Sequence, residues 1–554
     1  KMKDMERAVQ ILQKKITQKK KIRIIGDYDI DGVTATCILL KGLKRLGANV
    51  DTYIPDRVKD GYGMHEQLID KALEDGIDTI LTCDNGIAAA AEIEYAKKEG
   101  LTVIVTDHHE VPCEVTENGE KNYLYVNADA VVDPHRPDCA YPYKDLCGAG
   151  VAYKFIRHLY RVMELPWEGE DAYMDILALG TVCDIMPLTD ENRIFVKRGL
   201  RRLTNSTNLG INALKKALGL DGKPIEVHHL SFRIGPSLNS TGRLESAKEG
   251  VELLLTDDPA RAESLAQDMA KLNELRKEMT DRGVRAATDW VRKDIRMIPT
   301  EDGVKEKKIG DDKVIVLYMP GIHESIAGLI ASKLKEAFYR PTLVFTDAEN
   351  GHGLKGSGRS IETYNMFDKL CEHKELFVKV GGHPMAAGFT ITREALEPLR
   401  EALNRDCNLT DADLVEKLYV DESCAIKQLT LPLYEELAKL EPYGTANVRP
   451  LFGIVKMGIR SIKMVGNEGQ YARCTFVDGN GTRINGMVFR GKELLDNIKV
   501  WFGDKECDKI LKGLQNHALI DILYHMKKNE FNGTVSIQME PVSIRKSVYY
   551  ETSK

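Results

Sequence analysis

Short apolar runs alternate with amphipathic segments over the first hundred residues of the chain. Four runs have the length and composition of β-strands: residues 21–25, 48–54, 78–82 and 101–106. The segments between them have apolar residues at helical spacing, and each is followed by a glycine: residues 33–46, 64–75 and 88–98. This alternation predicts an α/β fold, with an open, mostly parallel sheet covered by helices on both faces.

Polar clusters follow three of these predicted strands. The clusters are GDYDIDG, CDNG and DHHE, and they contain Asp27, Asp29, Asp31, Asp84, Asp107, His108 and His109. Because the carboxyl ends of parallel strands lie along one edge of a sheet, we expect these side chains to meet there. Asp184 lies alone in the apolar run MDILALGTVCDIMPL, where an ionised carboxylate is costly unless it is paired or coordinated.

Three carboxylates within five residues repel one another unless something positive separates them. An EF-hand calcium loop also begins D-x-D-x-D-G, but its twelfth position counted from Asp27 is Ile38, where glutamate is required. An acidic, solvated turn is the simpler alternative, yet it gives no reason for three clusters at one edge. Carboxylates with one or two imidazoles favour Mn²⁺, Mg²⁺ or Zn²⁺, and the many oxygens favour the first two. We therefore expect two ions about 3.5–4 Å apart, an arrangement that hydrolyses phosphate esters.

Length and composition limit the class of protein. The chain has 554 residues, 43% hydrophobic and 29% charged, which predicts a globular protein of two to four domains. No apolar run approaches the roughly 20 residues of a membrane helix. Eleven scattered cysteines without a C-x-x-C pair argue against disulfides and structural zinc, and they predict a cytoplasmic location. The net charge of −6 argues weakly against nucleic-acid binding over the whole surface, but it leaves a locally basic groove open.

Two further regions follow the first sheet. Residues 211–220 and 259–290 are predicted helices, and the second of these either bridges two domains or lies on the surface. A strand at 313–319, a helix at 326–337 and a strand at 341–345 predict a second α/β unit. From about residue 451, short strands with turns such as DGNG predict a small β-barrel of the kind that binds oligonucleotides.

Several motifs resemble those of a known family. The series DYDIDG, CDNG, DHH and a later isolated aspartate resembles the DHH phosphoesterase superfamily, and GGHPMAAGF with SGRS resembles its companion DHHA1 domain. Four further stretches are similar to the RecJ family of single-strand-specific 5′→3′ exonucleases: DPHRPDCAYPYKDLCGAGVAYKF, FRIGPSLNSTGRL, GIHESIAGLIASKL and EPYGTANVRPLF. The chain departs from the family pattern at Asp133 (usually Asn), at STGR (usually AAGR) and at Ile322 (usually Trp), and residues 112–121 match nothing known.

The resemblance implies an architecture of two α/β domains joined by a long helix, plus a C-terminal OB-like β-barrel. The implied boundaries are a DHH catalytic domain at 1–200, a helical linker region at 201–300, a DHHA1 substrate-binding domain at 301–410 and an OB-like nucleic-acid-binding domain at 411–554.

The resemblance also implies roles for individual residues. The expected metal ligands are Asp27, Asp29, Asp31, Asp84, His108 and Asp184, with Asp84 bridging two ions. Asp107 orients an imidazole, and His109 protonates the leaving oxygen or holds the phosphoryl oxygens. A basic pocket for the terminal phosphate is implied at Arg57, Arg243, Ser357, Arg359, Gly382 and His383. For base stacking, Tyr443, Phe452 and Tyr471 are compatible, although aromatic residues of a small barrel more often form its core.

The implied function is a single-stranded-DNA-specific 5′→3′ exonuclease of DNA repair and recombination that uses Mn²⁺ or Mg²⁺ and releases 5′-mononucleotides. One alternative is a DHH-type phosphoesterase acting on short RNA oligonucleotides, cyclic dinucleotides or pyrophosphate, and the β-rich third domain counts against it. Another is an inactive binding protein like the Cdc45 relatives, against which the intact ligand motifs count. An RNA substrate stays open, because no motif reports 2′-OH recognition. The expected partners are single-stranded DNA, a RecQ-type helicase and a single-strand-binding protein, and the chain is expected to be a monomer without membrane association.

Overall fold

The computed structural model describes residues 1–548 except 57–62, 117, 119, 168, 170, 171, 245, 294, 301, 302, 350, 467, 468 and 532. It divides into two compact units, Lys1–Glu416 and Lys417–Lys554. All eleven cysteines are described, and each carries a free thiol. Among the helices that the structure describes, none is long and apolar enough to span a membrane.

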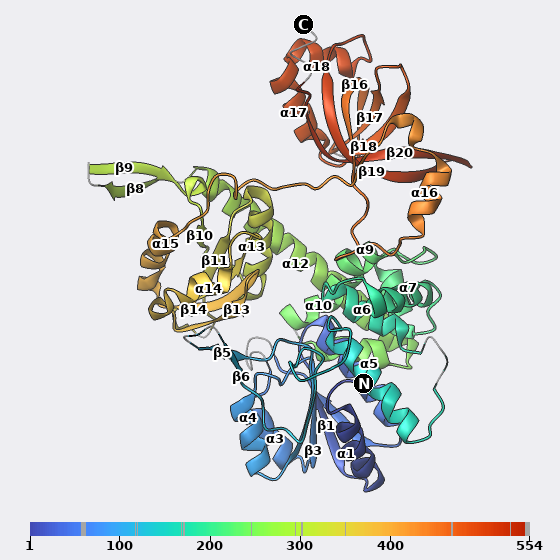
Figure 1. Ribbon diagram of the computed structural model, residues 1–554, viewed down its shortest axis with the longest axis vertical. Coiled ribbons are helices and arrows are strands. Elements are labelled where there is room, and N and C mark those ends of the chain that lie inside the picture. Colours follow the sequence, from blue (N-terminus) through green and yellow to red (C-terminus); the bar gives the residue numbers. More distant parts are fainter. Residues whose placement is uncertain are drawn as a thin grey trace. The chain divides into compact units, whose positions relative to one another are not determined.

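A five-stranded parallel sheet forms the N-terminal part of the first unit (Figure 1). Its strands, in the order β2–β1–β3–β4–β7, are β2 (Asn49–Tyr53), β1 (Lys21–Ile25), β3 (Thr79–Cys83), β4 (Thr102–Thr106) and β7 (Ala130–Val132). Ile24 of β1 lies opposite Thr52 and Leu81, which sets the register at the centre of the sheet. The first four strands lie within one residue of their predicted bounds, so the predicted α/β sheet is confirmed, whereas β7 was not predicted.

Helices cover both faces of this sheet. One core contains Ile24 of β1 together with α1 (Met5–Thr17), α2 (Ile30–Arg45) and α5 (Gly148–Val162). The next residue of β1, Ile25, belongs to a second core with α3 (Glu66–Glu74) and α4 (Ala90–Lys98). This alternation follows from the two-residue period of a strand. Because both faces are buried, the polar residues that follow the strands can gather only at the sheet edge.

A helical region follows the sheet and leads to a long helix. It contains α6 (Met174–Cys183), α7 (Asp190–Thr204), α8 (Leu209–Ala217), α9 (Val227–His229), a π-helical turn (Leu230–Ile234), α10 (Gly235–Leu244) and α11 (Lys248–Leu255). Helix α12 (Pro259–Lys293) then runs for 35 residues. Leu265 and Met269 of α12 belong to the first core, while Ala287 and Val291 belong to the core of the next α/β part. The prediction of a helix that joins two α/β parts is therefore confirmed.

The second α/β part has a mixed sheet in the order β10–β11–β12–β14–β13. Its strands are β10 (Ile315–Tyr318), β11 (Thr342–Asp347), β12 (Leu354–Arg359), β13 (Lys379–His383) and β14 (Ala386–Ile391), and only β10 and β11 are parallel. Helix α13 (Glu324–Phe338) packs on this sheet, and α14 (Met366–Cys371) and α15 (Leu396–Arg405) complete the part. Two hairpins lie outside both sheets: β5 (Cys113–Val115) with β6 (Lys121–Tyr123), and β8 (Ile295–Thr300) with β9 (Gly303–Lys308).

The second unit contains the predicted β-barrel (Figure 1). Its five long strands are β16 (Phe452–Val465), β17 (Tyr471–Val477), β18 (Arg483–Val488), β19 (Leu519–Phe531) and β20 (Thr534–Lys546), and pairing of β16 with β19 closes the barrel. The short strand β15 (Glu422–Ser423) and helix α16 (Leu431–Ala438) precede it. Two helices between β18 and β19, α17 (Gly491–Phe502) and α18 (Asp504–Leu511), were not predicted, although Leu494 and Ile498 of α17 are buried at helical spacing.

Helices α6 and α7 cross closely at Gly199. A Cβ atom at this position would lie 2.3 Å from the Cβ of Ala178 and 2.3 Å from the carbonyl oxygen of Met174. In an open helix, alanine is more stable than glycine by about 1 kcal/mol. Here we expect Gly199→Ala to lower the free energy of unfolding by about 1–3 kcal/mol, because the backbone of α6 must move.

Thermal unfolding of the full chain checks this expectation. Gly150→Ala is the control, because the nearest atom to a Cβ there is the Leu146 Cβ at 3.3 Å, and a smaller change in Tm is expected. A rise in Tm for Gly199→Ala would contradict the close crossing of α6 and α7.

Candidate metal centre and phosphate pocket

The aspartate-rich loop after β1 serves first to start helix α2. Asp29 is the N-cap residue, and its Oδ1 accepts hydrogen bonds from the backbone N–H groups of Asp31 at 2.9 Å and Gly32 at 3.1 Å. Carboxylates are favourable at this position because the first N–H groups of a helix lack backbone partners. The cap starts the helix at residue 30 instead of the predicted 33, and it places Asp31 in the first turn, pointing into the protein.

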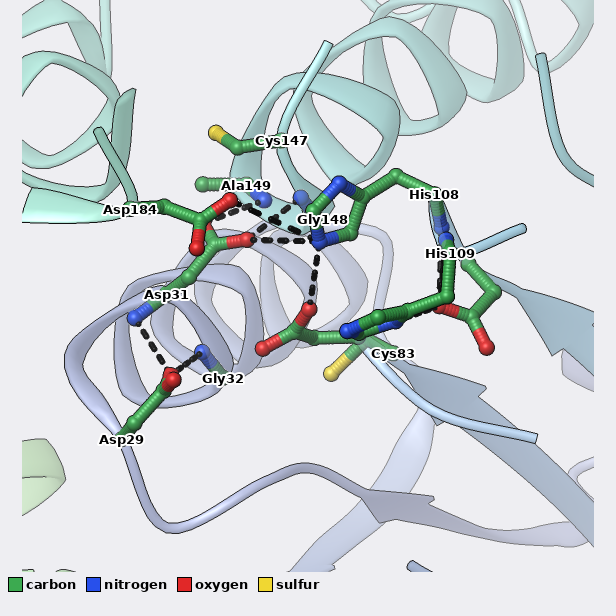
Figure 2. Close-up of polar contacts among 12 residues, drawn as sticks. Asp29, Asp31, Gly32, Cys83, His108, His109, Cys147, Gly148, Ala149 and Asp184 are labelled. Atoms are coloured by element: carbon green, nitrogen blue, oxygen red, sulfur yellow. Dashed lines mark hydrogen bonds and ion pairs between the residues drawn. The ribbon is translucent and has the colours of Figure 1, made fainter. Parts of the chain in front are cut away.

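Backbone amides from α5 hold the buried Asp31 side chain. Gly148 N–H donates to Asp31 Oδ2 at 2.5 Å, and Ala149 N–H donates to Asp31 Oδ1 at 3.0 Å (Figure 2). Both donors belong to the first turn of α5, whose positive end faces the carboxylate. Asp31 is thus oriented by two helices at once, its own and α5.

Three carboxylates converge on one ring nitrogen of His108. Nε2 of His108 lies 3.0 Å from Asp84 Oδ1, 3.6 Å from Asp31 Oδ2 and 3.6 Å from Asp184 Oδ2. Figure 2 shows Asp31 and Asp184 directed toward the His108 ring. The carboxylates come from α2, from the turn after β3 and from the C-terminal end of α6, so the cluster exists only in the folded chain.

All six residues expected as metal ligands lie in this cluster. Possible ligand atoms lie within 4.8 Å of one another in three overlapping sets: Asp31, His108 and Asp184; Asp27, Asp29 and Asp84; and Asp84, His108 and His109. Asp84 and His108 each belong to two sets. The structure brings the expected ligands together, while the ligand role of each residue, including a bridging Asp84, stays a prediction.

The protonation of these groups is set by burial. Burial and the neighbouring Asp31 raise the pKa of both Asp84 and Asp184 well above the usual range. Burial lowers the pKa of His108 to about 4, so its ring is neutral at neutral pH. One neutral ring nitrogen donates at most one hydrogen bond and carries no charge, so it cannot stabilise the ionised forms of these carboxylates, which burial makes costly. A divalent cation can, and an oxygen-rich donor set with a single buried imidazole fits Mn²⁺ or Mg²⁺.

Asp107 organises the loop that carries both histidines. Its Oδ1 lies 2.7 Å from Nδ1 of His109 and accepts from the backbone N–H of His108 at 2.8 Å, while its Oδ2 accepts from the backbone N–H of Ile87 at 2.9 Å. Although burial acts to lower it, the pKa of His109 is raised to about 9 by Asp107. His109 is therefore cationic at neutral pH, and 44% of its side chain is exposed.

Asp133 joins this edge of the sheet, and it was not among the predicted site residues. It follows β7, is fully buried, and its Oδ1 accepts from the backbone N–H of His135 at 2.7 Å. His135 in turn is hydrogen-bonded through Nδ1 to the carbonyl oxygen of His108. Burial raises the pKa of Asp133 to about 8. The stretch AVVDPH repeats the pattern of an apolar run followed by a polar cluster, and that pattern was the available signal.

Of the residues expected to bind phosphate, Arg243, Ser357 and Arg359 lie against helix α13. On β12, Arg359 Nη1 donates to Ser357 Oγ at 2.9 Å. Gly382 and His383 lie on β13, and burial together with Arg359 lowers the pKa of His383. From α10, Arg243 Nη1 donates to the carbonyl oxygen of Ser325 at 2.7 Å. The structure thus brings two predicted arginines to one helix, whereas the predicted Arg57 lies outside the described residues.

In the second unit, the aromatic candidates differ in exposure. Phe452 is 7% exposed and packs in the barrel core, and the Tyr443 hydroxyl donates to the Leu437 carbonyl at 2.6 Å. Tyr471 is exposed, and it makes an edge-to-face contact with Phe489 at a centroid distance of 5.9 Å. Phe489 was not predicted, and its place directly after an alternating strand was the only signal. Of the three candidates, Tyr471 therefore has the exposure that base stacking requires.

Three segments of the chain match known domain families. They are the DHH family, N-terminal domain, at residues 21–181, the DHHA1 domain at 311–408 and the RecJ OB domain at 420–542. The chain is 36% identical over 499 residues to the single-stranded-DNA-specific exonuclease RecJ of Bacillus subtilis, a match that covers 90% of this chain and 60% of that protein. It thus spans less than two thirds of that relative's length. With the protein of the same name from Dickeya dadantii it is 31% identical over 553 residues, covering 96% of this chain and 88% of that protein.

Solved structures of RecJ proteins also match this chain. Crystal structures of RecJ from Thermus thermophilus in complex with Mn²⁺ and with Mg²⁺ match 98% of this chain, with TM-scores of 0.78 and 0.72. Sequence identity is 28% and 27%, and the match covers 72% and 70% of the Thermus chains.

The close approach of α5 to the carboxylates yields a prediction at Gly148. A Cβ atom there would lie 2.7 Å from the Cβ of Asp84 and 2.9 Å from Asp31 Oδ2. We expect Gly148→Ala to displace both carboxylates and to weaken Mn²⁺ binding by about 10–100-fold, the range typical for loss of groups that orient ligands. Isothermal titration with Mn²⁺ measures this.

Gly150→Ala, two residues further along α5, is the matched control and should bind Mn²⁺ like the unaltered protein. Equal Mn²⁺ affinity of the Gly148→Ala protein would show that this cluster does not bind the ion.

Proposed function

Because this chain belongs to the RecJ family of single-stranded-DNA-specific exonucleases, we propose that it removes 5′-mononucleotides from the 5′ end of single-stranded DNA, in DNA repair and recombination. The observation that carries the proposal is the convergence of Asp31, Asp84 and Asp184 on Nε2 of His108. These groups lie at the carboxyl edge of a parallel sheet, which is where ligands bind in folds of this class.

We infer that Asp27, Asp29, Asp31, Asp84, His108 and Asp184 hold two Mn²⁺ or Mg²⁺ ions. The oxygen-rich donor set supports these ions, as do the Thermus thermophilus RecJ structures solved with each of them. When bound, the ions supply Lewis-acid activation of the phosphate and of the attacking water. The chain itself contributes to the fixed positions of the ligands, because the amides of Gly148 and Ala149 hold Asp31.

His109 is proposed as the group that works on the substrate. Its side chain is 44% exposed and lies beside the carboxylate cluster, so a ring N–H can donate to a phosphoryl oxygen or to the leaving 3′-oxygen. Asp107 sets the direction of the ring through the contact with Nδ1.

The direction of digestion needs a second site, which we assign to Arg243, Ser357, Arg359, Gly382 and His383, with Arg57 as a further proposed member. A planar guanidinium binds phosphate oxygens in pairs, and the two described arginines come from separate parts of the chain, α10 and β12. A 5′-terminal phosphate held there would place the first phosphodiester bond at the metal centre.

The remaining expectations become proposals with this function. We propose the boundaries 1–200, 201–300, 301–410 and 411–554 for the catalytic, linker, substrate-binding and OB-like segments, in line with the matched domain families. We also propose a cytoplasmic monomer, which the free thiols support. A RecQ-type helicase and a single-strand-binding protein would supply and protect the single strand.

The main experiment uses a single strand of about thirty nucleotides labelled at its 5′ end, with Mn²⁺ present. We expect immediate release of labelled mononucleotide, and we expect that EDTA or Asp84→Ala abolishes it, because either change removes the ions from the carboxylate cluster. A gradually shortening ladder would mean attack from the 3′ end or internally, and the pocket assignment would be wrong. Absence of cleavage with both Mn²⁺ and Mg²⁺ would favour a small phosphoester substrate or a binding role, and faster digestion of RNA would overturn the DNA preference.

The second unit offers a test of substrate contact away from the metal centre. We propose that Tyr471 on β17 and Phe489, which directly follows β18, form a stacking surface with the exposed Arg473 on β17 and Arg483 on β18, because this face of an OB barrel binds oligonucleotides. Replacing both aromatic residues with alanine should weaken binding of a thirty-nucleotide strand about tenfold, from stacking worth about 1–3 kcal/mol per base.

Fluorescence anisotropy measures this affinity. Val500→Ala removes an even more exposed apolar side chain, from α17, and should leave the affinity unchanged. Unchanged affinity of the double variant would show that this surface does not bind the strand.

A further inference from the structure

Three polar side chains, joined by one hydrogen bond and one ion-pair contact, lie at the start of helix α13. His323 caps the helix, and its Nδ1 lies 3.2 Å from the backbone nitrogen of Ser325 and 2.7 Å from Ser325 Oγ. On the other side of the ring, Nε2 lies 3.2 Å from Oε1 of Glu349, which follows β11. None of these three residues belongs to the metal centre or to the proposed phosphate ligands.

The partners determine the tautomer of His323. A backbone N–H can only donate, so Nδ1 accepts and the ring proton resides on Nε2, the nitrogen that lies within ion-pair distance of Glu349. The Ser325 hydroxyl then donates to Nδ1. The combination of serine, histidine and acid resembles a nucleophilic triad, but Ser325 is only 5% exposed, so a substrate does not reach its hydroxyl. We therefore assign these three side chains a structural role at the start of α13.

The two described arginines of the proposed pocket contact the same part of α13 as these three side chains. The carbonyl oxygen of Ser325 accepts from Arg243 Nη1 at 2.7 Å. One turn later, Gly328 leaves room for the other arginine, since a Cβ there would lie 2.8 Å from Arg359 Nη2 and 2.9 Å from Ser357 Oγ. The distance between Arg243 and Arg359 thus depends on where the first turn of α13 sits.

Further contacts tie the same turn to the mixed sheet. Lys355 Nζ, two residues before Ser357 on β12, donates to Glu324 Oε1 at 2.6 Å. Thr346 Oγ1 on β11 donates to the carbonyl oxygen of Ile322 at 2.8 Å. The contacts that run from Glu349 through His323 reach Ser325, whose carbonyl oxygen accepts from Arg243 of the pocket.

We propose that Glu349, His323 and Ser325 are positioning residues that set the spacing of Arg243 and Arg359, and that they thereby determine a preference for strands with a 5′-phosphate over strands with a 5′-hydroxyl. The inference rests on the proposed function in one respect, that a single strand enters with its 5′ end in this pocket. It adds the residues that make the pocket selective for the charged end.

The test measures binding without catalysis. Two thirty-nucleotide strands, labelled at the 3′ end and differing only in a 5′-phosphate or a 5′-hydroxyl, are titrated in EDTA and followed by fluorescence anisotropy. His323→Asn keeps a good N-cap for α13 but cannot bridge to Glu349, and Glu349→Gln keeps the size of the side chain while removing its charge. Glu336→Gln is the matched control, because Glu336 lies on the exposed side of the same helix and pairs with Lys333.

We expect the unaltered protein to bind the phosphorylated strand about tenfold more tightly, because charge-assisted contacts to phosphate are lost with the hydroxyl end. His323→Asn and Glu349→Gln should remove most of this ratio and leave the affinity for the hydroxyl strand unchanged, while Glu336→Gln keeps the ratio. A general structural defect would weaken both strands equally, and that result would overturn the proposal.

An unchanged ratio in both variants, or no preference in the unaltered protein, would also overturn it. The proposed function is judged separately, by release of labelled mononucleotide with Mn²⁺ from the same preparations. Release without a shift in the ratio rejects the positioning role alone. A shift in the ratio without any release rejects the exonuclease and leaves the selective pocket.

Discussion

Mutual repulsion among buried carboxylates is the constraint on which the rest of this structure depends. Asp31, Asp84 and Asp184 surround a ring nitrogen that carries no charge, and burial makes their ionised forms costly. The protein meets part of this cost with the backbone amides at the start of α5. A residue without a side chain is required at position 148, because any Cβ would press on two of the carboxylates. These amides meet only part of the cost of ionising the carboxylates, and a divalent cation would lower the rest.

The two adjacent histidines show how strongly local surroundings decide chemistry. Burial lowers the pKa of His108 to about 4, whereas Asp107 raises the pKa of its neighbour His109 to about 9. One ring is thus a neutral donor suited to a metal, and the next is a cation suited to phosphate oxygens. Asp107 accepts hydrogen bonds from both residues, so a single carboxylate orients the pair.

Helices α12 and α13 connect the two α/β parts of the first unit. The long helix contributes to two hydrophobic cores, one with the parallel sheet and one with the mixed sheet. Arg243 reaches from α10 to the first turn of α13, and Arg359 lies against the next turn. A pocket assembled from both α/β parts at one helix is sensitive to small shifts of that helix, which explains why its first turn carries so many side-chain contacts.

The sequence by itself determined the α/β class, the bounds of four central strands, the small barrel and the identity of the carboxylate and histidine motifs. It could do so because strand alternation and polar clusters at strand ends are local patterns, and the family motifs are long. The tertiary structure alone decided that Asp133 joins the sheet edge that carries the expected ligands, and that Phe489 is exposed while Phe452 is buried. These are contacts between residues distant in the chain or differences in burial, and periodicity carries no information about either. The opposite pKa shifts of His108 and His109 belong to the same class, because they arise from packing and not from residue type.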